Sequence, residues 1–269
     1  MESIQRVINI FGNDTQVSRD TKKILKQKLE KSGFLVPRVY DPNAELIICV
    51  GGDGSFLHTL RKYDFPKIPF IGVNTGHLGF FQELYPDQLD EFIFRYKMGN
   101  YEIQELKTIG AEITAGNEIV KVKGLNEIVI KGDKSITAHL NISIGESFVE
   151  RFSGDGILVA TPAGSTAYNY ALGGSIVDPR LTLLQITPIA PMNTTAYRSF
   201  TSSVIVPPDL SINIYPELSS ENAILVIADG IEYKYSELSQ ISISFSENTV
   251  QLLRFKDYDF WNKVKSKFL

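Results

Sequence analysis

Cysteine and histidine are scarce in this sequence of 269 residues, which contains one Cys and three His. Cys49 lies inside the apolar run 46–50, so we interpret it as a small buried side chain, and no disulfide can form within the chain. His58, His77 and His139 are widely spaced and have no cysteine partner, which argues against a metal site of the His/Cys type. Any metal that takes part is therefore expected to be a hard cation, bound mainly by substrate oxygens.

Long apolar runs and an excess of positive charge are also missing. No stretch approaches the roughly 20 apolar residues that span a bilayer, and residues 1–6 lack the layout of a signal peptide, so we expect a cytoplasmic protein. Lys and Arg number 27 and Asp and Glu number 31, which gives a net charge of −4. This balance does not attract nucleic acid or an anionic membrane, and we expect neither as a partner.

The first hundred residues alternate between strand-like and helix-like patterns. Strands are predicted over residues 6–11, 46–50 and 70–73, and helices over residues 14–32, 55–63 and 86–97. The apolar positions at helical spacing are Val17, Ile24, Leu25 and Leu29 in the first helix, and Leu89, Phe92, Ile93 and Tyr96 in the last. This βαβ order predicts an α/β domain over residues 1–100 with a parallel, Rossmann-like sheet.

Residues 101–248 have a different character, with many short segments that alternate apolar and polar side chains between Gly, Pro, Asn and Asp. Examples are residues 128–130, 140–144, 203–206 and 241–245. The pattern predicts a β-rich, sandwich-like domain with mainly antiparallel strands. Residues 249–269 are dense in aromatic side chains, and we expect this segment to dock on the first domain, with a helix over 254–269.

A Gly-rich turn, Gly51-Gly52-Asp53-Gly54, directly follows the predicted strand 46–50. Glycines at such a turn allow backbone N–H groups to approach a phosphate closely, although the pattern is neither a P-loop nor the usual Rossmann fingerprint. A carboxylate beside an anion is unfavourable unless it has a task, such as holding Mg²⁺ or accepting a proton from a hydroxyl. The alternative is a tight turn in which Asp53 bonds its own backbone.

A second polar cluster spans residues 74–81 and follows the predicted strand 70–73. In a parallel sheet this loop leaves from the same edge as the Gly-rich turn, so the two can flank one ligand. His77 is either a general base or, as we favour, a structural hydrogen-bonding residue. Phe80 or Phe81 is either a wall for an aromatic ligand or part of the core.

The third cluster, residues 154–169 followed by Gly173-Gly174-Ser175, combines a carboxylate, several hydroxyl groups and a Tyr between two turns. Such a set of donors and acceptors suits recognition of a sugar, an amide or a base, and we interpret it as a ligand site. The alternative is the polar surface of an ordinary sheet.

These clusters together resemble the bacterial NAD kinase family. The resemblance is carried by Gly51–Gly54, the loop 74–80, Asn126-Glu127, Gly154-Asp155-Gly156, and the segment from Thr161-Pro162 through Gly164-Ser165-Thr166-Ala167-Tyr168 to Gly173-Gly174. It covers the chain from about residue 45 to the aromatic tail. The Gly-Gly-Asp-Gly turn is shared with lipid and sugar kinases, whereas the block from Thr161 to Tyr168 together with Asn126-Glu127 is specific.

The resemblance implies transfer of the terminal phosphoryl group of ATP, with Mg²⁺ or another divalent cation bound through the substrate, to the 2′-hydroxyl of the adenosine ribose of NAD, which gives NADP. It implies that Asp53 accepts the hydroxyl proton and that Gly51, Gly52 and Gly54 shape the phosphate loop. Asn126 and Glu127 would contact adenosine and ribose, and Asp155 the nicotinamide end. The other implied nucleotide-binding residues are Phe80, Ala163, Thr166, Ala167, Tyr168, Asn169 and Ala190, the last closing the adenine pocket.

Two positions depart from the family pattern, since Arg is common at the position of Ser153 and Ser at that of Ala171. The resemblance implies a homo-oligomer, a dimer or tetramer, assembled through residues 101–248. Two other functions stay open. One is a lipid or sphingoid-base kinase that shares the Gly-Gly-Asp-Gly turn, and the other is a dinucleotide-binding regulator without catalysis.

Overall fold

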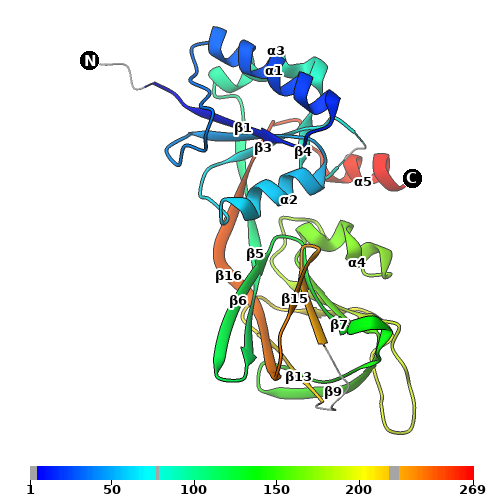
Figure 1. Cartoon of the computed structure of the whole chain (residues 1–269). Helices are drawn as coiled ribbons and strands as arrows, with labels where there is room; N and C mark the ends of the chain where they lie inside the picture. Colours follow the sequence, from blue (N-terminus) through cyan, green and yellow to red (C-terminus); the bar gives the residue numbers. More distant parts are fainter. Residues whose placement is uncertain (1–4, 77–78, 218–223) are drawn as a thin grey trace. The chain divides into compact units, whose positions relative to one another are not determined.

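The computed structural model of this chain describes residues 5–76, 79–217 and 224–269. These residues form two compact units (Figure 1). Unit 1 comprises Met1–Glu105 and Thr249–Leu269, and unit 2 comprises Leu106–Asn248. Two long strands, β5 (Glu102–Ala115) and β16 (Leu238–Arg254), run through the boundaries and connect the units covalently.

Unit 1 is built on a parallel sheet. Its strands are β1 (Ile8–Gly12), β2 (Leu46–Val50), β3 (Phe70–Val73) and β4 (Gln82–Leu84), and the end of β16 also pairs with β3 through Leu252 and Phe70. All of these pairings are parallel. Every residue of β2 and β3 is buried, as expected for strands that are covered on both faces.

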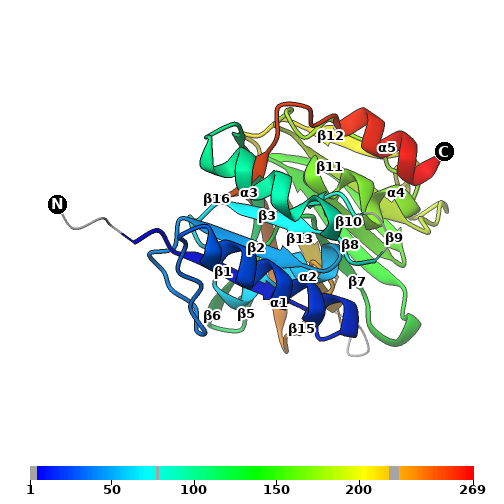
Figure 2. The same cartoon turned by 90° about the horizontal axis from the view of Figure 1, so that it is seen from above.

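Helices cover both faces of this sheet. They are α1 (Gln16–Lys31), α2 (Asp53–Lys62), α3 (Leu89–Lys97), which follows the short 3₁₀ helix η1 (Pro86–Gln88), and the C-terminal α5 (Phe260–Phe268). Figures 1 and 2 show α1 and α3 side by side on one face and α2 on the other. The apolar sides of α1 and α3 share one core with β1, β2 and β3, while Phe56 of α2 packs on Phe70 and Phe81.

The elements of unit 1 differ from the sequence expectation in several details, and the helices α1, α2 and α5 show why. In α1 Leu25 and Leu29 are buried, but Val17 and Ile24 are 55% and 47% exposed, because Ser18 and Thr21 occupy the inward face there. Helix α2 begins at Asp53 rather than at residue 55, with Gly52 as its N-cap. The C-terminal helix begins at Phe260 rather than at residue 254, because Arg254 ends strand β16 and Asp259 caps the helix by accepting from the N–H groups of Trp261 and Asn262.

Unit 2 consists of antiparallel strands in two layers. One sheet has the order β12-β11-β10-β7-β14-β15, with β12 (Val204–Val206), β11 (Leu184–Ile189), β10 (Gly156–Ala160), β7 (Glu127–Gly132), β14 (Ile224–Ala228) and β15 (Ile231–Lys234). The other layer contains β16, β13 (Ile212–Pro216), β8 (Ala138–Ile144) and β9 (Ser147–Gly154), and the hairpin of β5 and β6 (Glu118–Gly124) pairs with β16. Short helical turns complete it, namely η2 (Asp133–Ser135), η3 (Ala163–Thr166) and α4 (Tyr168–Ala171).

The core of unit 2 lies between these layers. Ile130 and Val159 of the first sheet belong to the same buried cluster as Leu140, Phe152 and Ile212 of the second. Facing sheets that bury alternate side chains in this way form a β-sandwich. The predicted fold class, a parallel α/β part and a β-rich, sandwich-like part, is therefore confirmed.

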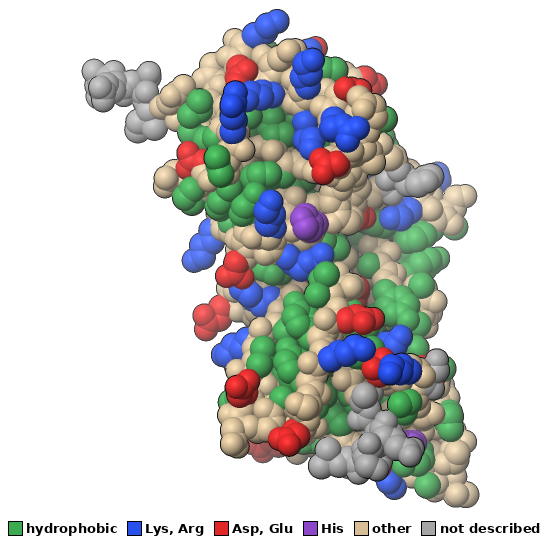
Figure 3. Space-filling model, viewed as in Figure 1, with side chains coloured by type: hydrophobic (Ala, Val, Ile, Leu, Met, Phe, Trp, Pro, Cys, Tyr) green, Lys and Arg blue, Asp and Glu red, His purple; other side chains and the backbone are tan. Residues whose placement is uncertain are grey.

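Charged side chains of both signs are interspersed on the face shown in Figure 3, in each unit. This agrees with the mildly acidic net charge of −4. Within the described residues, no helix has the length and apolar character that crossing a membrane requires.

Candidate functional site

The Gly-rich turn lies where the buried strand β2 ends and α2 begins. Gly51 has a φ of +148°, and a Cβ atom there would collide with the side chain of Ser55. Around Gly52 and Gly54, by contrast, no described protein atom lies within 4 Å of an added Cβ. Protein packing therefore requires glycine at position 51, whereas the backbone at positions 52 and 54 is left open for a ligand to approach.

Asp53 is the first residue of α2, and the loop after β3 holds its side chain. Its Oδ2 atom accepts from the N–H of Phe80 and its Oδ1 atom from the N–H of Phe81, both at 3.0 Å. The alternative reading, in which Asp53 bonds the backbone of its own turn, is thus not what the hydrogen bonds show. Two polar loops that follow neighbouring parallel strands meet at this carboxylate, as the sequence predicts.

The two aromatic residues of this loop contribute to packing. Phe80 is 7% and Phe81 4% exposed; Phe81 stacks on Phe56, and Phe80 lies against Phe260 and Phe268 of α5. The predicted contact between Phe80 and a nucleotide stays a prediction. His77 lies outside the described residues.

A pocket of about 520 Å³ opens beside the start of α2. Its lining residues are Ile10, Phe11 and Gly12 of β1, Asn13 and Asp14 after it, Lys22 of α1, Gly54, Ser55, His58, Thr59 and Lys62 of α2, and Tyr63 directly after α2. Lys22 donates to the carbonyl of Asn13 at 3.1 Å and lies 3.7 Å from Asp14. The volume is in the range of small-molecule sites, and the pocket combines two lysines with the first turn of a helix.

In unit 2 the Asn126-Glu127 pair is held by a residue that the sequence did not single out. Asp229 accepts hydrogen bonds from the N–H groups of Leu125 at 2.7 Å, Asn126 at 2.8 Å and Glu127 at 3.3 Å. Asp229 is 8% exposed and has a φ of +45° in the turn between β14 and β15. The Asp-Gly dipeptide of that turn is a hairpin signal, but nothing local indicates its partner about a hundred residues earlier.

The side chains of Asn126 and Glu127 are buried and incompletely satisfied. Asn126 Oδ1 and Glu127 Oε2 have no hydrogen-bond partner among the described residues. Burial, with a smaller contribution from the nearby carboxylate of Asp229, raises the pKa of Glu127 from 4.5 to about 8. Glu127 is thus protonated at neutral pH and can donate a hydrogen bond. Buried polar atoms without partners are unfavourable, so their occurrence in two consecutive residues indicates a ligand site.

The loop after β10 packs directly on this pair. A Cβ on Gly164 would collide with the backbone of Asn126, and the N–H of Thr161 donates to the Asn126 carbonyl at 2.9 Å. Thr161 Oγ1 donates to the Leu125 carbonyl at 2.7 Å and accepts from the N–H of Gly164 at 3.1 Å. The close approach brings η3, with Ala163 and Thr166, next to Asn126-Glu127.

Residues 167–169 divide between surface and core. Tyr168 is 43% exposed and Ala167 is partly buried, so both are accessible to a ligand. The side chain of Asn169 is fully buried; it donates to the carbonyls of Ser165 and Ser175 and accepts from Thr187 Oγ1 at 2.6 Å. In this arrangement Asn169 holds the loop together and has no exposed surface, so its contact with a nucleotide stays a prediction.

Asp155 and Ala190 lie apart from this cluster. Ala160, at one end of β10, pairs with Glu127, while Gly156, at the other end, pairs with Lys131 and Ile189. At the usual rise of a strand the two ends are about 13 Å apart. The N–H of Asp155 donates to the Ile189 carbonyl at 3.0 Å, which places Asp155 beside exposed Ala190. The structure therefore groups Ala190 with Asp155 and not with Thr166.

The described residues contain no group of three or more His, Cys, Asp or Glu side chains that could hold a metal ion. Cys49 is buried, and burial raises the pKa of its thiol to about 12, as expected for an unreactive core residue. Because Asp53 lies between the open glycines 52 and 54, its carboxylate is the candidate ligand for a cation that binds together with a phosphate.

Comparison with known proteins extends these observations over the whole chain. The profile of the ATP-NAD kinase N-terminal domain matches residues 9–101, and that of the ATP-NAD kinase C-terminal domain matches residues 125–255. The chain is 38% identical to a Finegoldia magna NAD kinase over 273 residues, which covers 100% of both chains. It is 33% identical to a Streptococcus gordonii NAD kinase over 274 residues, covering 100% of this chain and 97% of the relative.

Two solved structures share the fold. A yeast NADH kinase complexed with NADH has a TM-score of 0.84 at 20% identity and covers 98% of this chain and 87% of its own. An Archaeoglobus fulgidus NAD kinase in complex with ATP has a TM-score of 0.76 at 24% identity and covers 97% of this chain and 99% of its own.

Proposed function

The chain belongs to the NAD kinase family, and from this premise we propose that it transfers the terminal phosphoryl group of ATP to the 2′-hydroxyl of the adenosine ribose of NAD. The matches cover both units and the full length of named NAD kinases. They favour this activity over that of a lipid or sphingoid-base kinase and over a regulator without catalysis.

The observation that carries the proposal is the position of Asp53. Its carboxylate stands at the N-terminus of α2, between two open glycines, and is oriented by the N–H groups of Phe80 and Phe81. A ribose hydroxyl is a weak nucleophile, and an oriented carboxylate can accept its proton as the phosphorus–oxygen bond forms. Phosphoryl transfer otherwise needs positioning and charge neutralisation, so no His or Cys nucleophile is required.

We place the ATP phosphates at the open backbone of Gly52 and Gly54, with the rest of the nucleotide in the adjoining pocket of about 520 Å³. The helix N-terminus and the lysines of that pocket favour an anion there. Asp53 retains lone pairs beyond its two N–H bonds, which fits a hard cation whose other ligands are phosphate and water oxygens. Mg²⁺, when bound, would neutralise charge on the transferring phosphoryl group.

We place the adenosine of NAD at the unsatisfied atoms of Asn126 and Glu127, with exposed Tyr168 as a wall. Glu127, protonated at neutral pH, would donate to a ribose hydroxyl oxygen, while Asn126 Oδ1 would accept. Asp155 and Ala190, next to the far end of β10, would contact the nicotinamide end of NAD. This NAD would be either the molecule bound at Asn126-Glu127 of the same chain or one bound to a second copy of the chain. A homo-oligomer would make the second arrangement possible, and light scattering of the purified chain tests for it.

The direct test is NADP formation from NAD by the purified chain. We expect NADP with ATP and Mg²⁺, and none when either ATP or the divalent cation is left out. Inorganic polyphosphate in place of ATP, and NADH in place of NAD, define the donor and the acceptor in the same assay. Phosphorylation of diacylglycerol or a sphingoid base with no turnover of NAD would contradict the proposal, as would NAD binding without ATP consumption.

A further inference from the structure

The C-terminal helix α5 is attached to the loop that holds Asp53. The rings of Phe260 and Phe268 lie 6.0 and 5.8 Å from the ring of Phe80. The backbone N–H of Phe80 in turn donates to Asp53. Phe80 therefore contacts both Asp53 and α5, and it positions this side of α5 close to the carboxylate.

Lys263 forms the polar part of this attachment. Its ammonium group donates to the carbonyl of Phe80 at 3.3 Å and to that of Gln82. Burial lowers the pKa of Lys263 to about 8, and the positive charge of Arg254 contributes, since Arg254 donates to the same Phe80 carbonyl at 3.3 Å. Lys263 and Arg254 thus bind carbonyl groups of the segment 80–82, while the N–H groups of residues 80 and 81 donate to Asp53.

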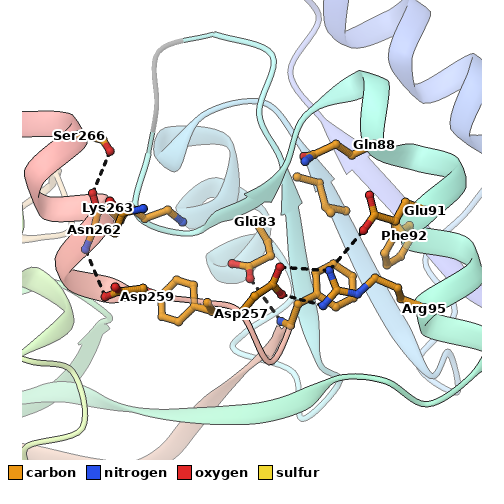
Figure 4. A pocket seen from close by; sticks show the side chains of 13 residues that line it. Glu83, Gln88, Glu91, Phe92, Arg95, Asp257, Asp259, Asn262, Lys263 and Ser266 are labelled. Atoms are coloured by element: carbon orange, nitrogen blue, oxygen red, sulfur yellow. Dashed lines mark hydrogen bonds and ion pairs between the residues drawn. The ribbon is translucent and has the colours of Figure 1, made fainter.

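A pocket of about 290 Å³ lies next to Lys263, where α5 is attached (Figure 4). Asn262, Lys263 and Ser266 of α5 lie on one side of it and Glu83, Arg95 and Asp257 on the other. Its charges already form pairs, since Arg95 lies 2.7 Å from Asp257 and Glu83 lies 2.8 Å from Arg254. We therefore interpret this pocket as part of the contact between α5 and the rest of unit 1, rather than as a ligand site.

One turn after Lys263, Lys267 reaches the carboxylate itself. Its Nζ atom lies 3.9 Å from Asp53 Oδ2 and 4.8 Å from the centre of the Phe80 ring, and its side chain is 31% exposed. The separation from Asp53 is too long for a hydrogen bond, and the ammonium makes none with the other residues that the structure describes, so its donors can serve a ligand. The contact with Phe80 holds the cation in place.

The amide of Gln82 adds an independent sign that a ligand group belongs here. Gln82 is 2% exposed, yet neither its Oε1 nor its Nε2 atom has a hydrogen-bond partner among the described residues. A Cβ on Gly79 would collide with both Gln82 Oε1 and Asp53 Oδ1, so the unsatisfied amide lies next to the carboxylate. A buried amide with no partner is unfavourable and is expected to be satisfied when the site is filled.

We propose that Lys267 binds the transferring phosphoryl group and is the lysine of the phosphoryl-transfer centre, supplied by α5 in a chain that lacks a P-loop lysine. The inference rests on the proposed NAD kinase activity and on Asp53 as its proton acceptor. The ribose 2′-oxygen forms a bond to the γ-phosphorus, the bond from that phosphorus to the β,γ-bridging oxygen breaks, and ADP leaves with the electron pair. The hydroxyl proton goes to Asp53, while Lys267 stays protonated.

Electrostatics explains why a lysine is useful at this position. Asp53 repels the phosphoryl group that has to come close to it, and an ammonium beside the carboxylate cancels this repulsion. The same ammonium stabilises the negative charge on the phosphoryl oxygens in the transition state. Loss of the Lys267 ammonium should therefore lower kcat and weaken ATP binding, and leave NAD binding unchanged.

The experiment compares Lys267→Ala, Lys267→Arg and the matched control Lys265→Ala, which removes an exposed lysine of the same helix. In the NADP assay we expect Lys267→Ala to lower kcat by about 100-fold, the usual size for loss of one charge-stabilising donor. Lys267→Arg should recover most of the loss, and Lys265→Ala should match the unmodified chain. Added methylammonium should partly restore Lys267→Ala, because it returns a cation to the vacated space.

A purely structural tie between α5 and Asp53 predicts a different result. Lys267→Ala would then lower the unfolding temperature while keeping kcat near that of Lys265→Ala, and methylammonium would have no effect; this result overturns the inference. If the unmodified chain itself makes no NADP from NAD and ATP, the proposed function has failed, and the two failures are thereby distinguished.

Discussion

Asp53 of unit 1 and Glu127 of unit 2 both carry a carboxyl group at the first position of an element, α2 and β7 respectively, but their surroundings differ. Asp53 is 28% exposed, accepts two backbone N–H bonds and has Lys267 at 3.9 Å. Glu127 is 7% exposed, has an unsatisfied Oε2 atom and lies near a second carboxylate, which together with burial raises its pKa to about 8. Donors and a cation favour the charged form of a carboxyl group, whereas burial and a like charge favour the neutral form.

This difference separates two tasks. A charged, accessible carboxylate suits proton acceptance, and a neutral, buried carboxyl group suits a directional hydrogen bond to a ligand. Chemistry is thus expected to depend on unit 1 and recognition of NAD on unit 2. Variants that affect kcat and NAD binding separately test this division.

The largest expected effect is that of Asp53→Asn. The amide cannot accept the hydroxyl proton, so NADP formation should fall on the order of 10²- to 10⁴-fold. Calorimetric titration with NAD should show unchanged affinity, because unit 2 is not altered. Turnover close to that of the unmodified chain would remove Asp53 from its assigned task.

Asp229→Ala should have the next largest effect, because it should lower both the stability of the chain and its affinity for NAD. It leaves the buried N–H groups of Leu125, Asn126 and Glu127 without their acceptor, which should lower the free energy of unfolding by about 3 kcal/mol. Urea unfolding measures this, with exposed Asp209→Ala as the control. A stability equal to that of the control would show that Asp229 does not organise this loop.

Tyr168→Ala tests the recognition side alone. Loss of a stacking wall should raise the KM for NAD by about 10-fold while changing kcat much less. Steady-state kinetics at saturating ATP give both constants. A decrease confined to kcat would argue against Tyr168 as a wall of the NAD site.

The last effect, small for each pH unit, is a pH dependence that Glu127 should impose on stability. Between pH 4.5 and about 8 the unfolded chain has lost the Glu127 proton while the folded chain still holds it, so stability decreases as the pH rises, by at most about 1.4 kcal/mol per pH unit. Glu127→Gln should lack this slope, and exposed Glu118→Gln should keep it. With rising pH, the stability measured by unfolding should therefore fall alike for the unmodified chain and Glu118→Gln and diverge from that of Glu127→Gln; three parallel curves would contradict a neutral Glu127.

Local patterns predicted the elements of the fold well where one residue type dominates. The apolar run Leu46–Val50 forms a completely buried strand, and Leu89, Phe92, Ile93 and Tyr96 all face the core from α3. Prediction was poorer where polar and apolar residues compete for a face, as in α1, where Ser18 and Thr21 are buried and Val17 is exposed. Spacing alone cannot determine which side of a helix meets its neighbours.

The candidate site shows the same division. Asp53, its glycines and Asn126-Glu127 are recognisable from the sequence because each belongs to a short motif with a characteristic backbone. Asp229 and Lys267 are not, since their partners lie more than a hundred residues away along the chain. Their importance follows from contacts, which no local pattern records.

The sequence by itself determined the βαβ and β-rich halves, the Gly-rich turn that exposes backbone donors, and the family to which the chain belongs. These properties depend on φ preferences, on hydrophobic periodicity and on motifs that are read residue by residue. The tertiary structure alone decided that Asp53 lies among N–H donors and a lysine, and that Glu127 is buried beside Asp229. The physical reason is that the charge and pKa of a side chain depend on the dielectric and on the neighbours that folding brings to it.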